Sequence, residues 1–391
     1  MKPKKSGQKG LETEELLRAY FLRAGFFVVR GIKLNHAGDD LTDIDLWVYE
    51  RSATLARRRT VIDIKDKGRP QAAERLFFIK GLAEVIGVEG AGVATSDPRP
   101  RLRELARKHS LLWIDGVDLQ RLKAADDFAA MERISEEDLL ALTAKLDRSR
   151  SSRAFGDALA QIKSATADRF GAASANSALD AAQFYMREAL AAFPGSEAAE
   201  ISIRLAYLSV ALAAAAFDFA SADVALRPQG DRQKSMTDAI RYGEDREGAI
   251  QRMRFAEALI RDYAPNGAAV AQIIKERLAS DLKAVPAEDL GEIAAKMSRT
   301  NMLFNVARAL EHAAYEETLR AFDDLGPDAK SFLGAVLDFT AVDRKGFALA
   351  WKTPDRIATA QVASALSAVE SAAEDSFENK EVSGNTSRRL I

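Results

Sequence analysis

The chain has 391 residues, with 56 Lys and Arg against 58 Asp and Glu, no Cys, and 47% hydrophobic residues. This composition excludes collagen-like, disordered and disulfide-stapled proteins, and it predicts a globular protein with a large core. Without cysteine the chain has no disulfide, thiolate metal ligand or cysteine nucleophile. The N-terminal residues contain no apolar segment of the kind found in signal peptides, so we expect a cytoplasmic protein.

Charge and periodicity change together near residue 120. The net charge is +5 before this position and −7 after it, which indicates that the two parts have different partners. Helical and strand patterns alternate in the first part, whereas Ala-rich helical patterns dominate the second. We therefore predict an α/β domain at 1–122, an all-α bundle or solenoid for interaction or regulation at 123–373, and a polar flexible tail at 374–391.

The first part contains eight predicted elements. A helix over 11–24 ends at Gly25, and strands follow at 26–34, 42–49 and 60–65. A helix over 71–86, a strand over 91–95, a helix over 99–109 and a strand over 111–114 complete the domain. This order predicts a mixed sheet with helices on both faces.

Proline and glycine divide the second part into helices of a length typical of antiparallel bundles. The longest apolar run, at 207–217, is shorter than the ~20 residues that a bilayer requires. We interpret it as a buried helix and expect no contact with a membrane.

Two carboxylates on neighbouring predicted strands are the strongest chemical signal. Asp45 lies on the second strand, and Asp63 lies on the third with Lys65 two positions later. Residues two apart in a strand share a face, so Lys65 points the same way as Asp63. If the strands pair, Asp45 and Asp63 can bind one divalent cation, and the carbonyl oxygen of Ile64 can complete its coordination. Oxygen ligands favour Mg²⁺, for which Mn²⁺ can substitute.

These groups suit the hydrolysis of a phosphodiester. That reaction needs an activated water, neutralisation of the transition-state charge, and stabilisation of the leaving alkoxide. Two carboxylates that hold a metal, with a lysine beside them, supply these functions.

The residues Asp45 and Asp63-Ile64-Lys65, after a helix that carries Glu14, resemble the PD-(D/E)xK nuclease superfamily. The similarity is strongest to its Mrr-like restriction endonuclease and Holliday-junction-resolvase-like branch, and it covers about residues 7–122. The resemblance implies a restriction-endonuclease-like fold and an Mg²⁺-dependent DNA endonuclease. Its catalytic residues would be Glu14, Asp45, Asp63 and Lys65, with Glu15 as the reserve for Glu14. It also implies a role in DNA repair or, given the appended helical region, in restriction and defence against phages.

Basic residues near the acidic motif have the chemistry needed to bind phosphates. The candidates are Arg57, Arg58, Arg59, Lys67 and Arg69. We also expect the helical region to form a homo-oligomer or to bind a protein partner. Two alternatives remain: a non-catalytic DNA-binding scaffold, and an RNA-cleaving enzyme of the same fold.

Overall fold

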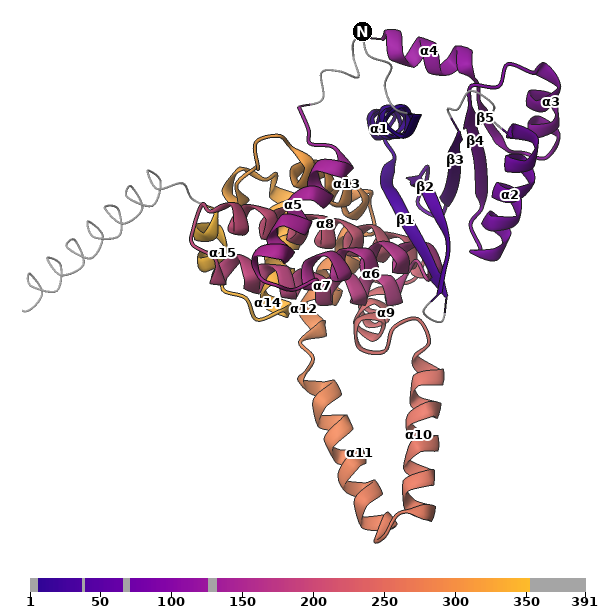
Figure 1. The fold of residues 1–391 in the computed structure, drawn as a ribbon. Coiled ribbons are helices and arrows are strands. Elements are labelled where there is room, and N and C mark those ends of the chain that lie inside the picture. Colours follow the sequence, from indigo (N-terminus) through magenta and orange to yellow (C-terminus); the bar gives the residue numbers. More distant parts are fainter. Residues whose placement is uncertain (1–5, 37–38, 66–70, 126–131, 352–391) are drawn as a thin grey trace, which may run out of the picture.

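The computed structural model describes residues 6–36, 39–65, 71–125 and 132–351 (Figure 1). The predicted tail at 374–391, together with Lys67 and Arg69, lies outside these residues. The described chain combines a five-stranded sheet with a large helical region, which confirms the predicted layout.

The N-terminal part follows the predicted order, with one further short helix at its end. Its helices are α1 (Ser6–Arg23), α2 (Ala72–Val85), α3 (Pro100–Lys108) and α4 (Gly116–Ala124). Its strands are β1 (Phe27–His36), β2 (Asp39–Arg51), β3 (Arg57–Lys65), β4 (Gly90–Thr95) and β5 (Leu112–Ile114). Gly25 ends α1 with a φ of 97°, a conformation that glycine adopts without a steric penalty.

The strands lie in the order β1-β2-β3-β4-β5. The β1–β2 and β2–β3 pairs are antiparallel, and the β3–β4 and β4–β5 pairs are parallel. Residues from α1 and α4 pack in one apolar cluster with the sheet, and residues from α2 and α3 belong to the other. Helices therefore cover both faces of the sheet, as predicted.

The helical region follows. Its α-helices are α5 (Glu136–Ser149), α6 (Ala154–Asp168), α7 (Ala172–Ala191), α8 (Glu197–Ala220), α9 (Gln229–Tyr242), α10 (Arg246–Tyr263), α11 (Gly267–Ala284), α12 (Ala287–Met297), α13 (Met302–Tyr315), α14 (Pro327–Phe339) and α15 (Arg344–Ala350). Two short 3₁₀ helices, η2 (Ser221–Val224) and η3 (Phe322–Asp324), connect them.

Helix α8 is the central helix of this region. By length and composition alone this helix could cross a membrane. However, 83% of its most apolar stretch is buried inside the protein. It packs against α5, α6, α7 and α13 (Figure 1). The apolar run at 207–217 therefore forms a buried helix, as predicted.

The sheet and the helical region share one apolar core. Trp47 and Tyr49 of β2 pack against Phe170. The centroid of the Phe170 ring lies 4.6 Å from that of Trp47 and 5.3 Å from that of Tyr49. Tyr49 also contacts Phe304 of α13. These side chains belong to the cluster that includes the interior of the helical region. Helices α6, α8 and α13 therefore cover the part of the sheet that α2 and α3 leave open.

Buried charges cross the same boundary. Arg18 of α1 donates hydrogen bonds to Glu136 of α5 and, at 2.9 Å, to Glu311 of α13. Glu136 also accepts hydrogen bonds from Lys163 and Tyr315. Burial alone would raise the pKa of Glu136, but Lys163 and Arg18 outweigh it and hold this pKa at about 2. The carboxylate therefore stays ionised in the core.

The Glu136→Gln substitution tests this network. It leaves Lys163 without its acidic partner and removes one of the partners of Arg18, which keeps Glu311. We therefore expect a loss of roughly 3 kcal/mol in the free energy of unfolding, the scale for a broken buried ion pair. Because the folded pKa lies below the ordinary value of 4.5, the contribution is complete above pH 4.5 and is lost as the pH falls toward about 2. Urea unfolding at several pH values should show this acid dependence in the native protein and less of it in Glu136→Gln.

The Glu197→Gln substitution is the control. Glu197 pairs with Lys145 on the surface, where ion pairs contribute 0 to about 1 kcal/mol. Equal losses for the two variants would contradict a special role for Glu136.

Candidate active site

The predicted catalytic residues of the strands meet at one place on the sheet. The Nζ atom of Lys65 lies 3.4 Å from Oδ2 of Asp45 and 3.3 Å from Oδ1 of Asp63. Thus β2 supplies one carboxylate, β3 supplies the other, and the ammonium group lies between them. The sequence motif predicted this convergence.

Local backbone geometry explains why Asp45 points here. The β2–β3 ladder ends, among the described residues, at the pair Leu46 and Ile62, and its continuation would place Asp45 opposite Asp63. Instead, the carboxylate of Asp45 accepts a hydrogen bond of 2.6 Å from the backbone N–H of Ile64. The Asp45 side chain thus replaces the ladder partner of β3. The N–H and C=O of one strand residue face the same neighbouring strand. We therefore infer that the Ile64 carbonyl also points toward Asp45 of β2.

Asp63 is more buried than the sequence pattern predicts. A polar strand face would leave it exposed, yet only 3% of its surface is accessible. The guanidinium group of Arg75 from α2 binds both carboxylate oxygens, with one distance of 2.8 Å. This pairing raises the pKa of Arg75, so the arginine stays charged. Substitution of Asp63 by alanine would leave that charge unpaired, which makes Asp45 and Lys65 the cleaner positions to test.

Sequence reasoning missed Arg75. A signal was present, because Arg75 lies in the first turn of the helix that follows the Asp-x-Lys motif and packs on the strand that carries it. Its side chain also lies over the ring of Phe78, 4.0 Å from the centroid, which fixes the guanidinium beside Asp63.

Glu14 approaches the site from α1 but has a partner of its own. Its Oε2 accepts hydrogen bonds of 3.0 and 2.8 Å from Arg30 of β1. Burial raises the pKa of Glu14; Arg30 opposes this shift, and the negative charge of Asp45 adds to it. Glu14 is therefore an electrostatic neighbour of Asp45. The reserve residue Glu15 binds Arg30 and Arg18 and accepts from the N–H of Glu136, so it belongs to the buried network instead.

The donor set matches the requirements of Mg²⁺. Among the described residues, no group of three or more acidic or histidine side chains lies close enough to hold a metal by itself. Mg²⁺ in proteins is usually bound by one or two carboxylates and keeps several waters. Asp45 and Asp63 are such a pair, and burial together with the nearby charge of Asp63 raises the pKa of Asp45. A divalent cation would relieve this repulsion, so the residues fit the ion.

The predicted phosphate-binding arginines lie elsewhere. Arg57 is eight residues from Lys65 along β3, about 26 Å at ~3.3 Å per residue. Its buried side chain pairs with Asp218 of α8, and Arg59 pairs with Glu89 at 2.6 Å. Arg58 is exposed and lines a cavity on the face covered by α1 and α4. The described part of the predicted basic set is therefore not placed to hold a phosphate over Asp63.

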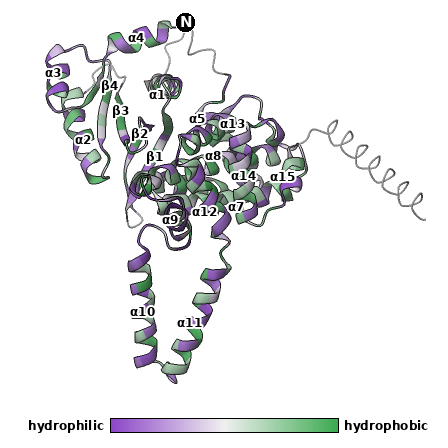
Figure 2. Cartoon of the chain, turned by 180° about the vertical axis from the view of Figure 1, so that it is seen from behind, coloured by the Kyte–Doolittle hydropathy of each residue, from purple (hydrophilic) through white to green (hydrophobic). Residues whose placement is uncertain are grey.

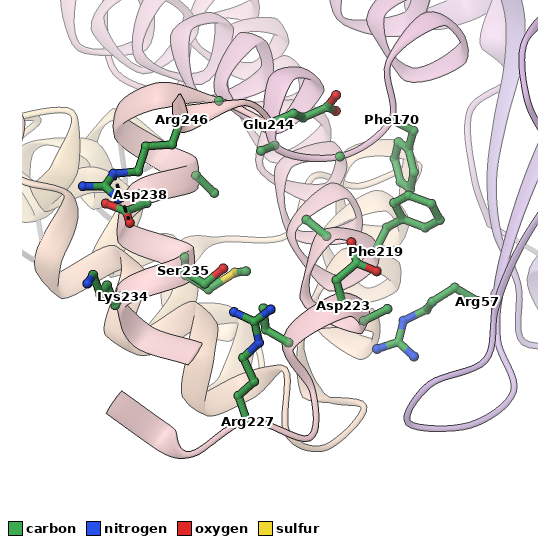
Figure 3. A pocket seen from close by; sticks show the side chains of 18 of the residues that line it. Arg57, Phe170, Phe219, Asp223, Arg227, Lys234, Ser235, Asp238, Glu244 and Arg246 are labelled. Atoms are coloured by element: carbon green, nitrogen blue, oxygen red, sulfur yellow. Dashed lines mark ion pairs between the residues drawn. The ribbon is translucent and has the colours of Figure 1, made fainter. Parts of the chain in front are cut away.

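A large cavity is separate from the acidic site. It has a volume of about 830 Å³ and lies between the start of β3 and helices α7 and α9 (Figure 3). Its lining mixes arginines such as Arg57, Arg227 and Arg246 with acids such as Asp223 and Asp238. None of Glu14, Asp45, Asp63 and Lys65 lines it.

The chain matches no protein-family model, no curated protein and no solved structure.

The Asp63→Asn substitution tests the buried pairing with Arg75. Asparagine keeps the shape but loses the charge, so we expect a loss of about 2 kcal/mol in the free energy of unfolding, the scale for a hydrogen bond to a charged group. Asp43→Asn, at an exposed position on β2, should change stability by less than about 0.5 kcal/mol. Urea unfolding measures both. An Asp63→Asn protein as stable as Asp43→Asn would show that the pair contributes nothing.

Proposed function

We propose that the chain is a metal-dependent nuclease of the PD-(D/E)xK type that hydrolyses phosphodiester bonds in DNA. The observation that carries this proposal is the position of Lys65 between Asp45 and Asp63, at the point where the β2–β3 ladder ends. The mixed sheet with helices on both faces supports the restriction-endonuclease-like fold that the sequence resemblance implies.

Each residue has a defined role in this proposal. Asp45 and Asp63 hold Mg²⁺, or Mn²⁺ in its place, with the Ile64 carbonyl on the same edge. The bound cation supplies an acidified water and neutralises charge on the phosphate. As an ammonium group paired with both carboxylates, Lys65 would stabilise the charge that develops on the phosphoryl oxygens. The alternative role, removal of a proton from the attacking water, would require its neutral form. Arg75 holds Asp63 in place, and Glu14 acts on Asp45 through its charge.

The biological role rests on the family resemblance. Repair, recombination and restriction are the settings that it implies, and the large helical region favours restriction and defence against phages. This assignment is by analogy and adds nothing to the chemistry of the site.

Two ion pairs favour a second candidate, a DNA-binding scaffold without catalysis. Arg75 donates hydrogen bonds to both carboxylate oxygens of Asp63. Arg30 donates two hydrogen bonds to one carboxylate oxygen of Glu14. In a scaffold, Arg75 would take the place of the metal at Asp63 permanently. In an enzyme, Arg75 has to share Asp63 with the cation. A measurement of cleavage decides between the two.

The decisive experiment is cleavage by the full chain with Mg²⁺, Mn²⁺ or EDTA, on plasmid DNA and on RNA of similar length. We expect metal-dependent cleavage of DNA that EDTA abolishes. Lys65→Ala and Asp45→Asn should each reduce the rate by at least ~10²-fold, because these groups act on the transition state. Preferential cleavage of RNA would instead support the RNA-cleaving alternative.

Asp43→Asn is the matched control, because it removes an exposed carboxylate two residues from Asp45 on the same strand. It should cleave at the native rate. If Lys65→Ala and Asp45→Asn also cleave at that rate, the observed activity has another source and the proposed site is wrong. Absence of cleavage in the native protein, with DNA binding intact, would favour the scaffold.

A further inference from the structure

Helices α10 and α11 form an arm that projects from the protein, which we define as residues Arg246–Ala284 (Figures 1 and 2). Each helix has 18 residues and is therefore about 27 Å long. Helix α10 contains no buried residue, and α11 buries only Gly267 and Ala271. The arm thus gains almost nothing from the core of its own chain.

The turn between the two helices fixes the shape of the arm. Asn266 has a φ of 53°, and a Cβ atom at Gly267 would lie 2.3 Å from the carbonyl oxygen of Arg261. Lys275 of α11 pairs with Glu257 of α10 at 3.6 Å. The helices therefore pack as a defined antiparallel hairpin.

One set of apolar residues is used between the two helices. Ile250, Met253 and Ile260 of α10 are half-buried, as is Ile274 of α11, and Ala271 is buried. Their spacings of three and seven are those of a helical seam. This seam accounts for the contact inside the hairpin and leaves the other apolar residues of the arm unexplained.

A second apolar set is exposed on the half of the arm furthest from the body. Tyr263 is 84% exposed, Phe255 66% and Ile273 65%. Leu259 is also exposed and Val270 is half-buried. We call these five residues the arm patch. Side chains of this size at such exposure are typical of a surface that another molecule covers.

Helical geometry places the patch on one side of the arm. Successive residues are rotated by ~100° about the helix axis. This rotation places Leu259 and Tyr263 to one side of the seam of α10. It places Val270 and Ile273 to one side of the seam of α11, in the same sense of rotation. Because the helices are antiparallel, rotation in the same sense brings both pairs to one side. Phe255 lies on the outer edge beside Leu259.

The opposite side of the arm carries more basic than acidic residues. The same geometry places Arg254 and Arg261 of α10 there, together with Lys275 and Lys283 of α11. Two of these are paired, Lys275 with Glu257 and Arg261 with Asp262. The patch side carries charges of both signs, with Arg277 paired to Asp281 at 3.1 Å. Two arms that pack patch to patch keep their basic sides apart, whereas any other pairing of identical arms brings like charges together or leaves the patch exposed.

The contact area is at the lower limit for a specific dimer. Along its full length of about 27 Å, this side of two helices that are each ~10 Å wide presents on the order of 500 Å² per copy, or about 1,000 Å² in total, and the arm patch covers the outer half of it. A pair of hairpins packed face to face forms a four-helix bundle, which is a common stable arrangement for helices with one apolar side.

We propose that the arm patch binds the arm patch of a second copy of this chain and forms a four-helix bundle between two protomers. The proposal is independent of the nuclease assignment, and its test uses neither DNA nor metal. The two proposals can therefore fail separately.

The test is the mass of the full chain in solution, measured by sedimentation equilibrium over a wide range of concentrations. We expect a dimer for the native protein. The double substitution Leu259→Glu with Ile273→Glu should weaken association by at least ~10-fold, or about 1.4 kcal/mol, and give a monomer at moderate concentration. Because the arm lies outside the core, thermal unfolding of this variant should match that of the native protein at a concentration low enough for both to be monomeric.

The control is Phe193→Glu with Leu226→Glu, which places the same charges at exposed apolar positions outside the arm. It should remain a dimer. A monomeric native protein overturns the proposal, and so does a dimer that survives the arm substitutions.

Discussion

The structure depends on the burial of two guanidinium groups, those of Arg18 and Arg30. A buried charge costs several kcal/mol unless opposite charges surround it, and α1 and β1 do not supply enough of them. Glu136 and Glu137 come from α5, and Glu311 comes from α13. The sheet therefore reaches a stable state only when the helical region is packed on it. This requirement explains why the acids of α1 have fixed positions, including Glu14 beside the candidate site.

The site itself depends on a different constraint, the separation of β2 from β3. A backbone N–H freed from a ladder needs a new acceptor, and Asp45 provides it for Ile64. The same bond aims the carboxylate of Asp45 at Lys65 and Asp63. Secondary structure and chemistry are thus linked here, because the residue that ends the strand pairing is also the residue that faces the candidate metal. Arg75 then completes the neutralisation of Asp63 from the neighbouring helix.

Local patterns in the sequence predicted the elements of the N-terminal part. They also predicted that the side chains of Asp45, Asp63 and Lys65 lie close together, because residues two apart in a strand share a face. Partners distant in sequence were not predictable in this way. Arg30 interrupts an apolar strand and so signals a buried charge, but nothing local identifies Glu137 as its partner. Likewise, the helices that separate at Gly171 and Gly243 have no proline to mark the break. Their positive φ values appear only in the structure.

The shared core has a consequence for how such a chain can evolve. Trp47 and Tyr49 present aromatic rings on one face of the sheet, and Phe170 and Phe304 cover them from the helical region. If the N-terminal part were transferred alone to another gene, it would carry these rings on its surface. Arg18 and Arg30 would also lose the acidic partners that the helical region supplies. Recombination at the boundary between the two parts is therefore unfavourable. The helical region can diversify at its arm and its outer helices, while the residues that meet the sheet must change together with it.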